Sequence, residues 1–216
     1  MATEETKEKI VETALQMFNS RGCRGVTMDD IAQALHMSKR TLYETFANKE
    51  ELLAECLMRV HDQINDMHRQ AHQKVDEPLL VAMYMLRVGA DTNHRYHRLI
   101  EEAERYYPEI HDRFFHLHTE ALHSMMKHGM EYVKSHNYLR PDADVDVAVD
   151  FLCDLMQQHR LSDVSDPKAY IYRLNEICFT YLRGLMNTAT IGRYEQSETH
   201  FRQVMEELGW NSEKTV

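Results

Sequence analysis

The sequence predicts an all-α protein, with a small N-terminal unit of three helices joined by a long helix to a larger helical domain. Two observations support this fold class. Apolar residues recur at intervals of three and four along most of the chain, which is the spacing of one face of an α-helix. Only seven Gly and four Pro interrupt the 216 residues, and no stretch alternates apolar and polar residues as a half-buried strand would.

The first helix is expected from about Glu4 to Arg21. Ile10, Ala14 and Phe18 recur every four residues and form its inner face. Gly22 then ends it, because glycine is favoured just past the end of a helix. No residue of this helix carries distinctive chemistry, so we expect it to serve as scaffold for the two helices that follow.

Two short helical patterns follow back to back. Thr27 is expected to cap the first and Ser38 the second, because a side-chain hydroxyl can accept a hydrogen bond from a free backbone N–H group there. Only His36 and Met37 remain for the bend, so a left-handed backbone conformation would fall on His36. This layout is that of a helix-turn-helix, in which the second helix, here 39–46, enters the major groove of DNA.

The outward side of that second helix carries side chains suited to DNA. Its first turn holds Lys39 and Arg40 within reach of base edges or phosphates, and Tyr43 offers a hydroxyl to a phosphate oxygen. Asn48 and Glu51 form a capping-box-like start for the next helix, whose free N–H groups favour phosphate. The predicted DNA contacts are Thr27, Ser38, Lys39, Arg40, Thr41, Tyr43 and Lys49.

The positions of this frame keep their spacing without a gap: Ile10, Ala14, Phe18, Gly22, Thr27, Ile31, Ala32, Leu35, Ser38, Thr41, Leu42, Tyr43, Phe46, Lys49, Glu50, Glu51 and Leu52. Residues 10–57 therefore resemble the DNA-binding segment of the TetR family of transcriptional regulators. The bend has His36-Met37 where that family often has Gly-Val, and Arg40 stands where a small residue is frequent. Glu44, four residues after Arg40, could either pair with it or repel phosphate.

The resemblance implies a homodimeric, ligand-responsive transcriptional regulator, most often a repressor, that reads a palindromic operator in double-stranded DNA. It implies a DNA-binding domain at residues 1–50 and a helical effector-binding and dimerisation domain at residues 51–216. Such a protein is not an enzyme and needs no cofactor or metal. Its effector is expected to be a small molecule of unknown identity.

The middle of the chain is rich in methionine and aromatic residues. Helices are expected over about 49–73, 79–90, 92–107 and 109–136. Deformable Met side chains suit a pocket for varied apolar ligands, although an ordinary helical core would have the same composition. The resemblance favours the pocket, because TetR-like proteins bind effectors among these helices. The predicted ligand contacts are Tyr84, Met85, Tyr96, Tyr106, Phe115 and Met126.

Two further long helices are expected at about 143–159 and 168–189. Their apolar stripes are too broad for one contact, so one side can meet the core while another meets a second subunit. Two helices from each chain would form a four-helix interface about a two-fold axis, and the resemblance implies the same arrangement. The tail at 192–216 has one amphipathic turn set that is expected to dock on the body.

An alternative function rests on the chain's 14 histidines. His94, His97 and Glu101 are spaced three and four apart and could hold a metal ion. A metal-responsive regulator or a metal-dependent enzyme would follow. Against the enzyme stand the lack of a Gly-rich phosphate loop and of a nucleophile motif. His61, His68 and His72 also fall near one side of a helix, where a solvated face is the simpler interpretation.

Charge and composition bound the remaining possibilities. The net charge of −10 argues against a protein held on nucleic acid by charge alone. No apolar run approaches the ~18 residues that span a bilayer, and the polar N-terminus lacks a signal-peptide core. We therefore expect a cytoplasmic protein with no membrane partner. The four scattered cysteines are expected to be buried apolar side chains without disulfides.

Overall fold

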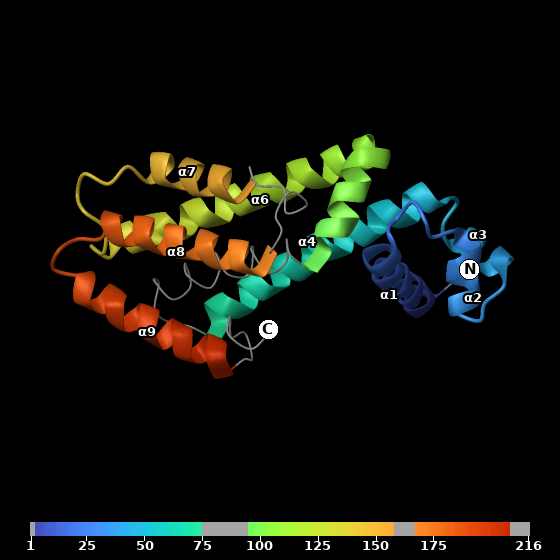
Figure 1. Ribbon diagram of the computed structural model, residues 1–216, viewed down its shortest axis with the longest axis horizontal. Coiled ribbons are helices and arrows are strands. Elements are labelled where there is room, and N and C mark those ends of the chain that lie inside the picture. Colours follow the sequence, from blue (N-terminus) through green and yellow to red (C-terminus); the bar gives the residue numbers. More distant parts are fainter. Residues whose placement is uncertain (1–2, 75–94, 158–166, 208–216) are drawn as a thin grey trace. The chain divides into compact units, whose positions relative to one another are not determined.

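The computed structural model describes residues 3–74, 95–157 and 167–207. Within these ranges the regular structure is helical apart from one isolated bridge between Leu139 and Met186. The predicted all-α class is thus confirmed. The labelled helices (Figure 1) are α1 Glu4–Arg21, α2 Met28–Ala34, α3 Lys39–Thr45, α4 Lys49–Lys74, α6 Pro108–Ser135, α7 Val145–Gln157, α8 Pro167–Leu185 and α9 Ile191–Glu207. A further helix covers residues 95–106.

The first three helices begin and end where their local signals lie. Gly22 follows α1 with a φ of 85°, a conformation that glycine adopts without a steric penalty. The bend between α2 and α3 contains His36 with a φ of 51°. The prediction that this histidine takes the left-handed conformation is confirmed. Histidine tolerates that region better than a β-branched residue would.

The described residues form two compact units. The N-terminal unit comprises residues 3–65 and 95–118, and the C-terminal unit comprises residues 66–74, 119–157 and 167–207. Helices α4 and α6 each have residues in both units. Residues 51–65 therefore pack with the N-terminal unit. The predicted boundary between residues 50 and 51 separates the DNA-binding segment from the effector-binding segment, and it stays a prediction.

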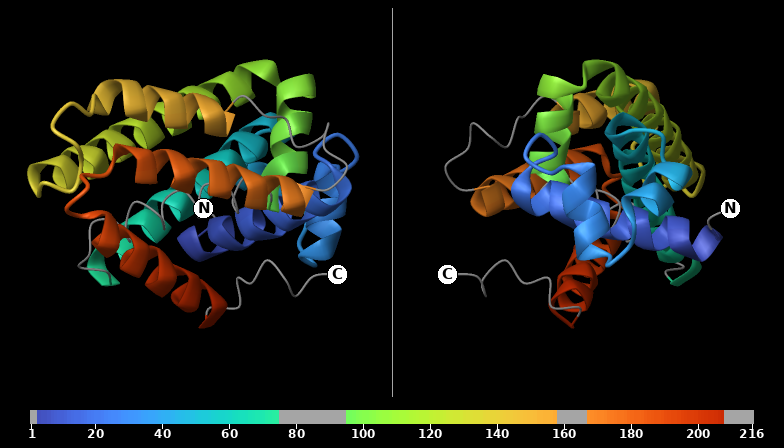
Figure 2. Two further views of the ribbon diagram at one scale, coloured as in Figure 1. Left: turned by 60° about the vertical axis from the view of Figure 1, so that its left-hand side comes forward. Right: turned by 90° about the vertical axis from the view of Figure 1, so that its right-hand side faces the viewer.

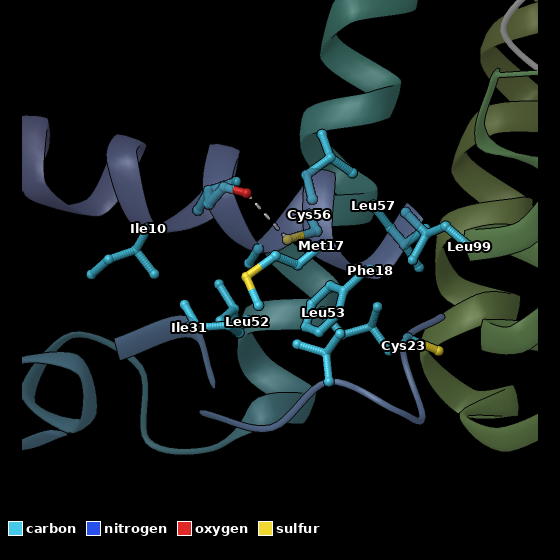
Figure 3. Close-up of a cluster of buried hydrophobic side chains, with 14 of the residues drawn as sticks. Ile10, Met17, Phe18, Cys23, Ile31, Leu52, Leu53, Cys56, Leu57 and Leu99 are labelled. Carbon is cyan, nitrogen blue, oxygen red and sulfur yellow. Dashed lines mark hydrogen bonds between the residues drawn. The ribbon is translucent and has the colours of Figure 1, made fainter. Parts of the chain in front are cut away.

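The core of the N-terminal unit joins segments that are far apart in the sequence. Figure 3 draws Ile10 and Phe18 of α1, Leu52 of α4 and Leu99 of helix 95–106 as members of one cluster, and all four side chains are fully buried. Burying a side chain of this size stabilises a fold by about 1.5–3 kcal/mol. The helix 95–106 is therefore part of the same cooperative core as the helix-turn-helix.

The core of the C-terminal unit is formed by α6, α7, α8 and α9. Figures 1 and 2 show α7 and α8 running alongside the C-terminal part of α6, and Met126, Val149 and Leu182 are buried there together. The sequence predicted only one amphipathic turn set in the C-terminal tail, whereas the structure has the full helix α9 there. Its Tyr194 and Phe201 are buried.

All four cysteines are buried free thiols, as expected. Burial raises the pKa of the Cys153 thiol to about 11 and that of the Cys178 thiol to about 12. These side chains therefore stay protonated near neutral pH and act as small apolar residues. Among the described helices, none combines the length and the apolarity needed to cross a membrane.

Candidate nucleic-acid interface

Helix α3 is anchored by one face and exposes the other. Leu42 is fully buried and Phe46 is 2% exposed, whereas Tyr43 is 49% exposed. The backbone N–H of Thr41 donates to Ser38 Oγ over 3.1 Å, which confirms the predicted cap. Because the inner face is held by the core and the first turn by the cap, the outer side chains are presented on a rigid helix.

The two cations of α3 each pair with a carboxylate. Lys39 Nζ forms an ion pair with Asp29 of α2, and Arg40 Nε lies 2.7 Å from Glu44 Oε1 within α3. The sequence left two roles open for Glu44, and in the structure Glu44 pairs with Arg40. All four side chains are more than half exposed, so water screens both pairs and their contribution to stability is small.

The start of α2 is a complete capping box. Thr27 Oγ1 accepts from the backbone N–H of Asp30 over 3.2 Å, and Asp30 Oδ2 accepts from the backbone N–H of Thr27 over 2.8 Å. The Thr27 hydroxyl also donates to Asp30 Oδ2 over 2.6 Å, and this bond together with that from the Thr27 backbone N–H holds the pKa of Asp30 below its usual value. The side chain of Thr27 is thus committed to orienting α2.

The start of α4 has the predicted capping pattern. Asn48 Oδ1 accepts from the backbone N–H of Glu51 over 2.8 Å, and Glu51 Oε2 accepts from that of Ala47 over 2.7 Å. Lys49, however, is half-buried: its Nζ lies 3.4 Å from the carbonyl oxygen of Arg24 and 5.9 Å from the centre of the Tyr107 ring. Its predicted contact with phosphate stays a prediction.

The predicted DNA contacts are therefore partly brought together. Lys39, Arg40 and Tyr43 are exposed on α3, next to the exposed cap Ser38 and the half-buried Thr41. Thr27 caps α2 and Lys49 is the first residue of α4, and both belong to the same compact unit. The exposed surface of α3 is the candidate interface, and it has the size and shape of a helix that can enter a major groove.

Sequence reasoning missed the contact that holds the end of α1. The backbone N–H of Arg24 donates to Glu102 Oε2 over 3.1 Å, and Arg98 Nη1 donates to the carbonyl of Ser20 over 2.7 Å. The Arg24 guanidinium also lies over the Tyr106 ring at 4.9 Å. These partners are about 80 residues apart in sequence, so no local pattern predicts that the helix 95–106 contacts this loop.

The predicted ligand contacts lie in different surroundings. Tyr84 and Met85 lie outside the described residues. Tyr96 is half-buried and donates to Gln63 Oε1 over 2.8 Å, while Tyr106 and Phe115 are exposed on the N-terminal unit at 37% and 40%. Met126, the last residue of the predicted set, is 7% exposed in the core of the C-terminal unit. These four side chains do not line one described cavity, and a ligand site formed by the set stays a prediction.

A polar cavity lies on the C-terminal unit. Its lining comprises Thr119, Glu120, His123, Ser124, Asp150, Cys153 and Asp154. His123 Nε2 and Asp150 Oδ1 are 2.9 Å apart across it, from α6 to α7. An apolar effector would find little complementary surface here, because the exposed groups are hydroxyls and carboxylates.

Among the described residues, no arrangement of side chains supports the alternative of a metal site. His94 lies outside the described residues, and His97 and Glu101 are half-buried on helix 95–106. No cluster of three or more His, Cys, Asp or Glu with metal-binding geometry occurs among the described residues. The pair His61 and His118 has ring centres 6.0 Å apart, and burial lowers the pKa of His118 to about 4.

Helices α7 and α8 present a partly exposed apolar face. Val147 and Phe151 of α7 and Ile177 of α8 are 60%, 42% and 52% exposed. The Phe151 ring contacts the Tyr181 ring with centres 4.6 Å apart, which joins the two helices. Large apolar side chains gathered on two adjacent helices are typical of a surface that another protein covers.

The candidate interface coincides with a family match. Residues 10–56 match the family described as bacterial regulatory proteins, tetR family. The helix-turn-helix transcriptional repressor KstR2 of Mycobacterium tuberculosis is 28% identical over 150 residues, which cover 68% of this chain and 75% of that protein. IcaR, the negative transcriptional regulator of the icaADBC biofilm operon of Staphylococcus epidermidis, is 23% identical over 135 residues, covering 60% of this chain and 63% of that protein.

Solved structures share the fold. A TetR-family transcriptional regulator from Pectobacterium atrosepticum superposes with a TM-score of 0.67 at 16% identity, covering 85% of this chain and 95% of that one. This likeness concerns the fold, while the match over residues 10–56 concerns the DNA-binding segment itself. The chain therefore resembles the TetR family of bacterial regulatory proteins in its DNA-binding segment and in its fold.

Proposed function

We propose that the protein is a homodimeric, ligand-responsive repressor that reads a palindromic DNA operator with two copies of α3. One observation carries the proposal. The exposed side of α3 presents Arg40 and Tyr43 on a helix whose opposite side is locked by Leu42 and Phe46. A rigid, capped helix with polar tips is what major-groove readout requires.

Dimerisation is supported by the apolar face of α7 and α8. A two-fold axis through this face would place the same residues of both chains in contact, as an isologous interface requires. Two recognition helices must then lie about 34–36 Å apart to enter successive major grooves. The acidic net charge of −10 fits this arrangement, because one copy of α3 binds DNA weakly and two linked copies bind it far more tightly.

Ligand response is supported by the continuity of two helices. Both α4 and α6 have residues in the N-terminal and the C-terminal unit. A ligand that shifts either helix would therefore move residues of both units. Such a ligand alters DNA affinity only by its differential affinity for the two states, typically ~1–3 kcal/mol. KstR2 is described as a ketosteroid transcriptional regulator, so a ketosteroid belongs in the first screen of apolar effectors.

The test is selection of DNA from a random library by the full-length protein, followed by binding titrations on the enriched duplex. We expect an inverted repeat whose half-sites are one helical turn apart, or a multiple of it. Tyr43→Phe should weaken binding to all duplexes alike by roughly threefold to tenfold, because it removes one phosphate hydrogen bond.

A matched control is available for that substitution. Tyr132 is 50% exposed, nearly the same as Tyr43, but belongs to the C-terminal unit. Tyr132→Phe should leave DNA binding unchanged. Failure of the wild-type protein to enrich any sequence, or equal effects of the two tyrosine substitutions, would contradict the proposal that α3 is the DNA-binding surface.

A further inference from the structure

We propose that Arg40 reads a guanine in each operator half-site and that Glu44 is the positioning residue that aims its guanidinium. This inference rests on the proposed function and deepens it, because it assigns a base to one side chain of the interface. It starts from the ion pair between Arg40 Nε and Glu44 Oε1, which are 2.7 Å apart on the exposed side of α3.

The atom that Glu44 engages decides which atoms remain for DNA. A guanidinium carries five N–H donors in one plane, one on Nε and four on the two terminal nitrogens. Glu44 contacts Nε, so the terminal nitrogens stay available as an end-on fork. Guanine presents two adjacent acceptors, N7 and O6, at its major-groove edge. The spacing of the fork matches that pair of acceptors, which is why arginine is the commonest specific reader of guanine.

The neighbouring side chains of α3 are less suited to base readout. Lys39 is the other cation of the helix, and its ammonium is paired with Asp29 of α2. The hydroxyl of Thr41 lies 2.8 Å from Ser38 Oγ and is part of the cap. By contrast, the Arg40 side chain is 87% exposed and lies in the first helical turn, which leads into the groove.

Glu44 also determines how much of the Arg40 charge acts on phosphates. The pair is electrically neutral, so as a unit it attracts the DNA backbone weakly and contributes sequence preference more than affinity. Removing the carboxylate would free Arg40 to swing toward a phosphate. Binding to unrelated DNA would then strengthen and depend more steeply on salt, by about one released counterion per half-site. The preference for guanine would fall at the same time.

The experiment compares two duplexes, the operator enriched by the wild-type protein and a variant with the proposed G·C pair replaced by A·T in both half-sites. The wild-type protein should prefer the first by roughly fivefold to 150-fold per half-site. Arg40→Ala should abolish that preference and leave preferences at other positions intact. Arg40→Lys should also lose it, because a single ammonium lacks the planar fork.

Glu44→Gln gives the distinguishing readout. It should reduce the guanine preference while it tightens binding to unrelated DNA and steepens the salt dependence. The matched control is Glu5→Gln, because Glu5 pairs with Lys9 four residues away on α1, at 2.6 Å and with both side chains exposed. That control makes the same change in charge and should leave both readouts unchanged.

Two results would overturn the inference without touching the proposed function. The first is sequence-specific binding in which Arg40→Ala retains every base preference. The second is a uniform loss of affinity for all duplexes in Glu44→Gln, which would make Glu44 a supporting residue of the helix and not an aiming one. If the wild-type protein selects no sequence at all, the proposed function itself fails. Helical content by circular dichroism confirms that each variant is folded.

Discussion

At the scale of single residues, burial changes the chemistry of one histidine. The His118 ring stacks on Phe114 with centres 5.6 Å apart and lies edge-on to His61 at 6.0 Å. Burial in this apolar contact, and the nearby His61, lower the pKa of His118 to about 4 from a usual value of 6.5. The neutral form is therefore the one that the folded state favours.

The sign of the resulting pH dependence follows from the two states. Below the unfolded value of 6.5 and above about 4, the unfolded chain binds a proton at His118 that the folded chain does not. Acidification through this window therefore favours unfolding, by about 2 kcal/mol between about pH 7 and about pH 5. Urea titrations at both pH values measure it.

The contribution of His118 is isolated by substitution. His118→Gln should lose about 2 kcal/mol less stability than the wild-type protein on the same acidification. His128→Gln, which changes an exposed histidine on α6, should behave as the wild-type protein does. An unchanged pH dependence in His118→Gln would show that His118 is protonated in the folded state at about pH 5, and the burial argument would be wrong.

At the scale of elements, α1 ends because a glycine permits it. Gly22 has a φ of 85° and ψ of 144°, a region that residues with a Cβ atom rarely adopt. A Cβ added there would lie 2.1 Å from a carboxylate oxygen of Glu102, and that carboxylate is held by the N–H of Arg24. The conformation and the space both favour glycine.

Gly22→Ala should therefore destabilise the protein by about 1–3 kcal/mol through backbone strain, with a further cost for displacing Glu102. The matched control is Gly129→Ala within α6, where nothing lies within 4 Å of the added Cβ. That substitution should stabilise by about 0.5–1 kcal/mol, because alanine loses less conformational entropy in a helix. Chemical denaturation measures both, and equal effects would contradict the assigned strain.

At the scale of the whole molecule, assembly depends on the apolar face of α7 and α8. Phe151→Glu together with Ile177→Glu would bring charges into the proposed interface, and unpaired buried charge is costly. We expect sedimentation to report a single chain of 25.6 kDa in place of a dimer. Operator affinity should fall sharply at the same time, because half of the paired contacts are lost.

Leu117→Glu is the control for that substitution. Leu117 is 44% exposed, similar to Phe151, but belongs to the N-terminal unit. It should leave the dimer intact. A wild-type protein that sediments as a single chain at micromolar concentration, or a dimer that survives both substitutions on α7 and α8, would remove this face from the assembly.

Local rules were sufficient for the first three helices and their boundaries, although not for the full length of α9. The caps Thr27 and Ser38, the end of α1 at Gly22 and the left-handed His36 all depend on residues within about four positions of one another. The spacing of Leu42 and Phe46 likewise determines which side of α3 is buried. The sequence alone therefore predicted the helix-turn-helix and the all-α class.

Contacts between distant segments were decided only by the tertiary structure. Lys49 turns toward Arg24, Glu102 reaches the loop after α1, and Phe115 is exposed while Met126 is buried. Periodicity states which residues share a helix face, but not which partner covers that face or which carboxylate reaches a given N–H group. Caps and turns are short-range and sequence-encoded, whereas the partners of exposed charges and the lining of cavities depend on how the helices pack.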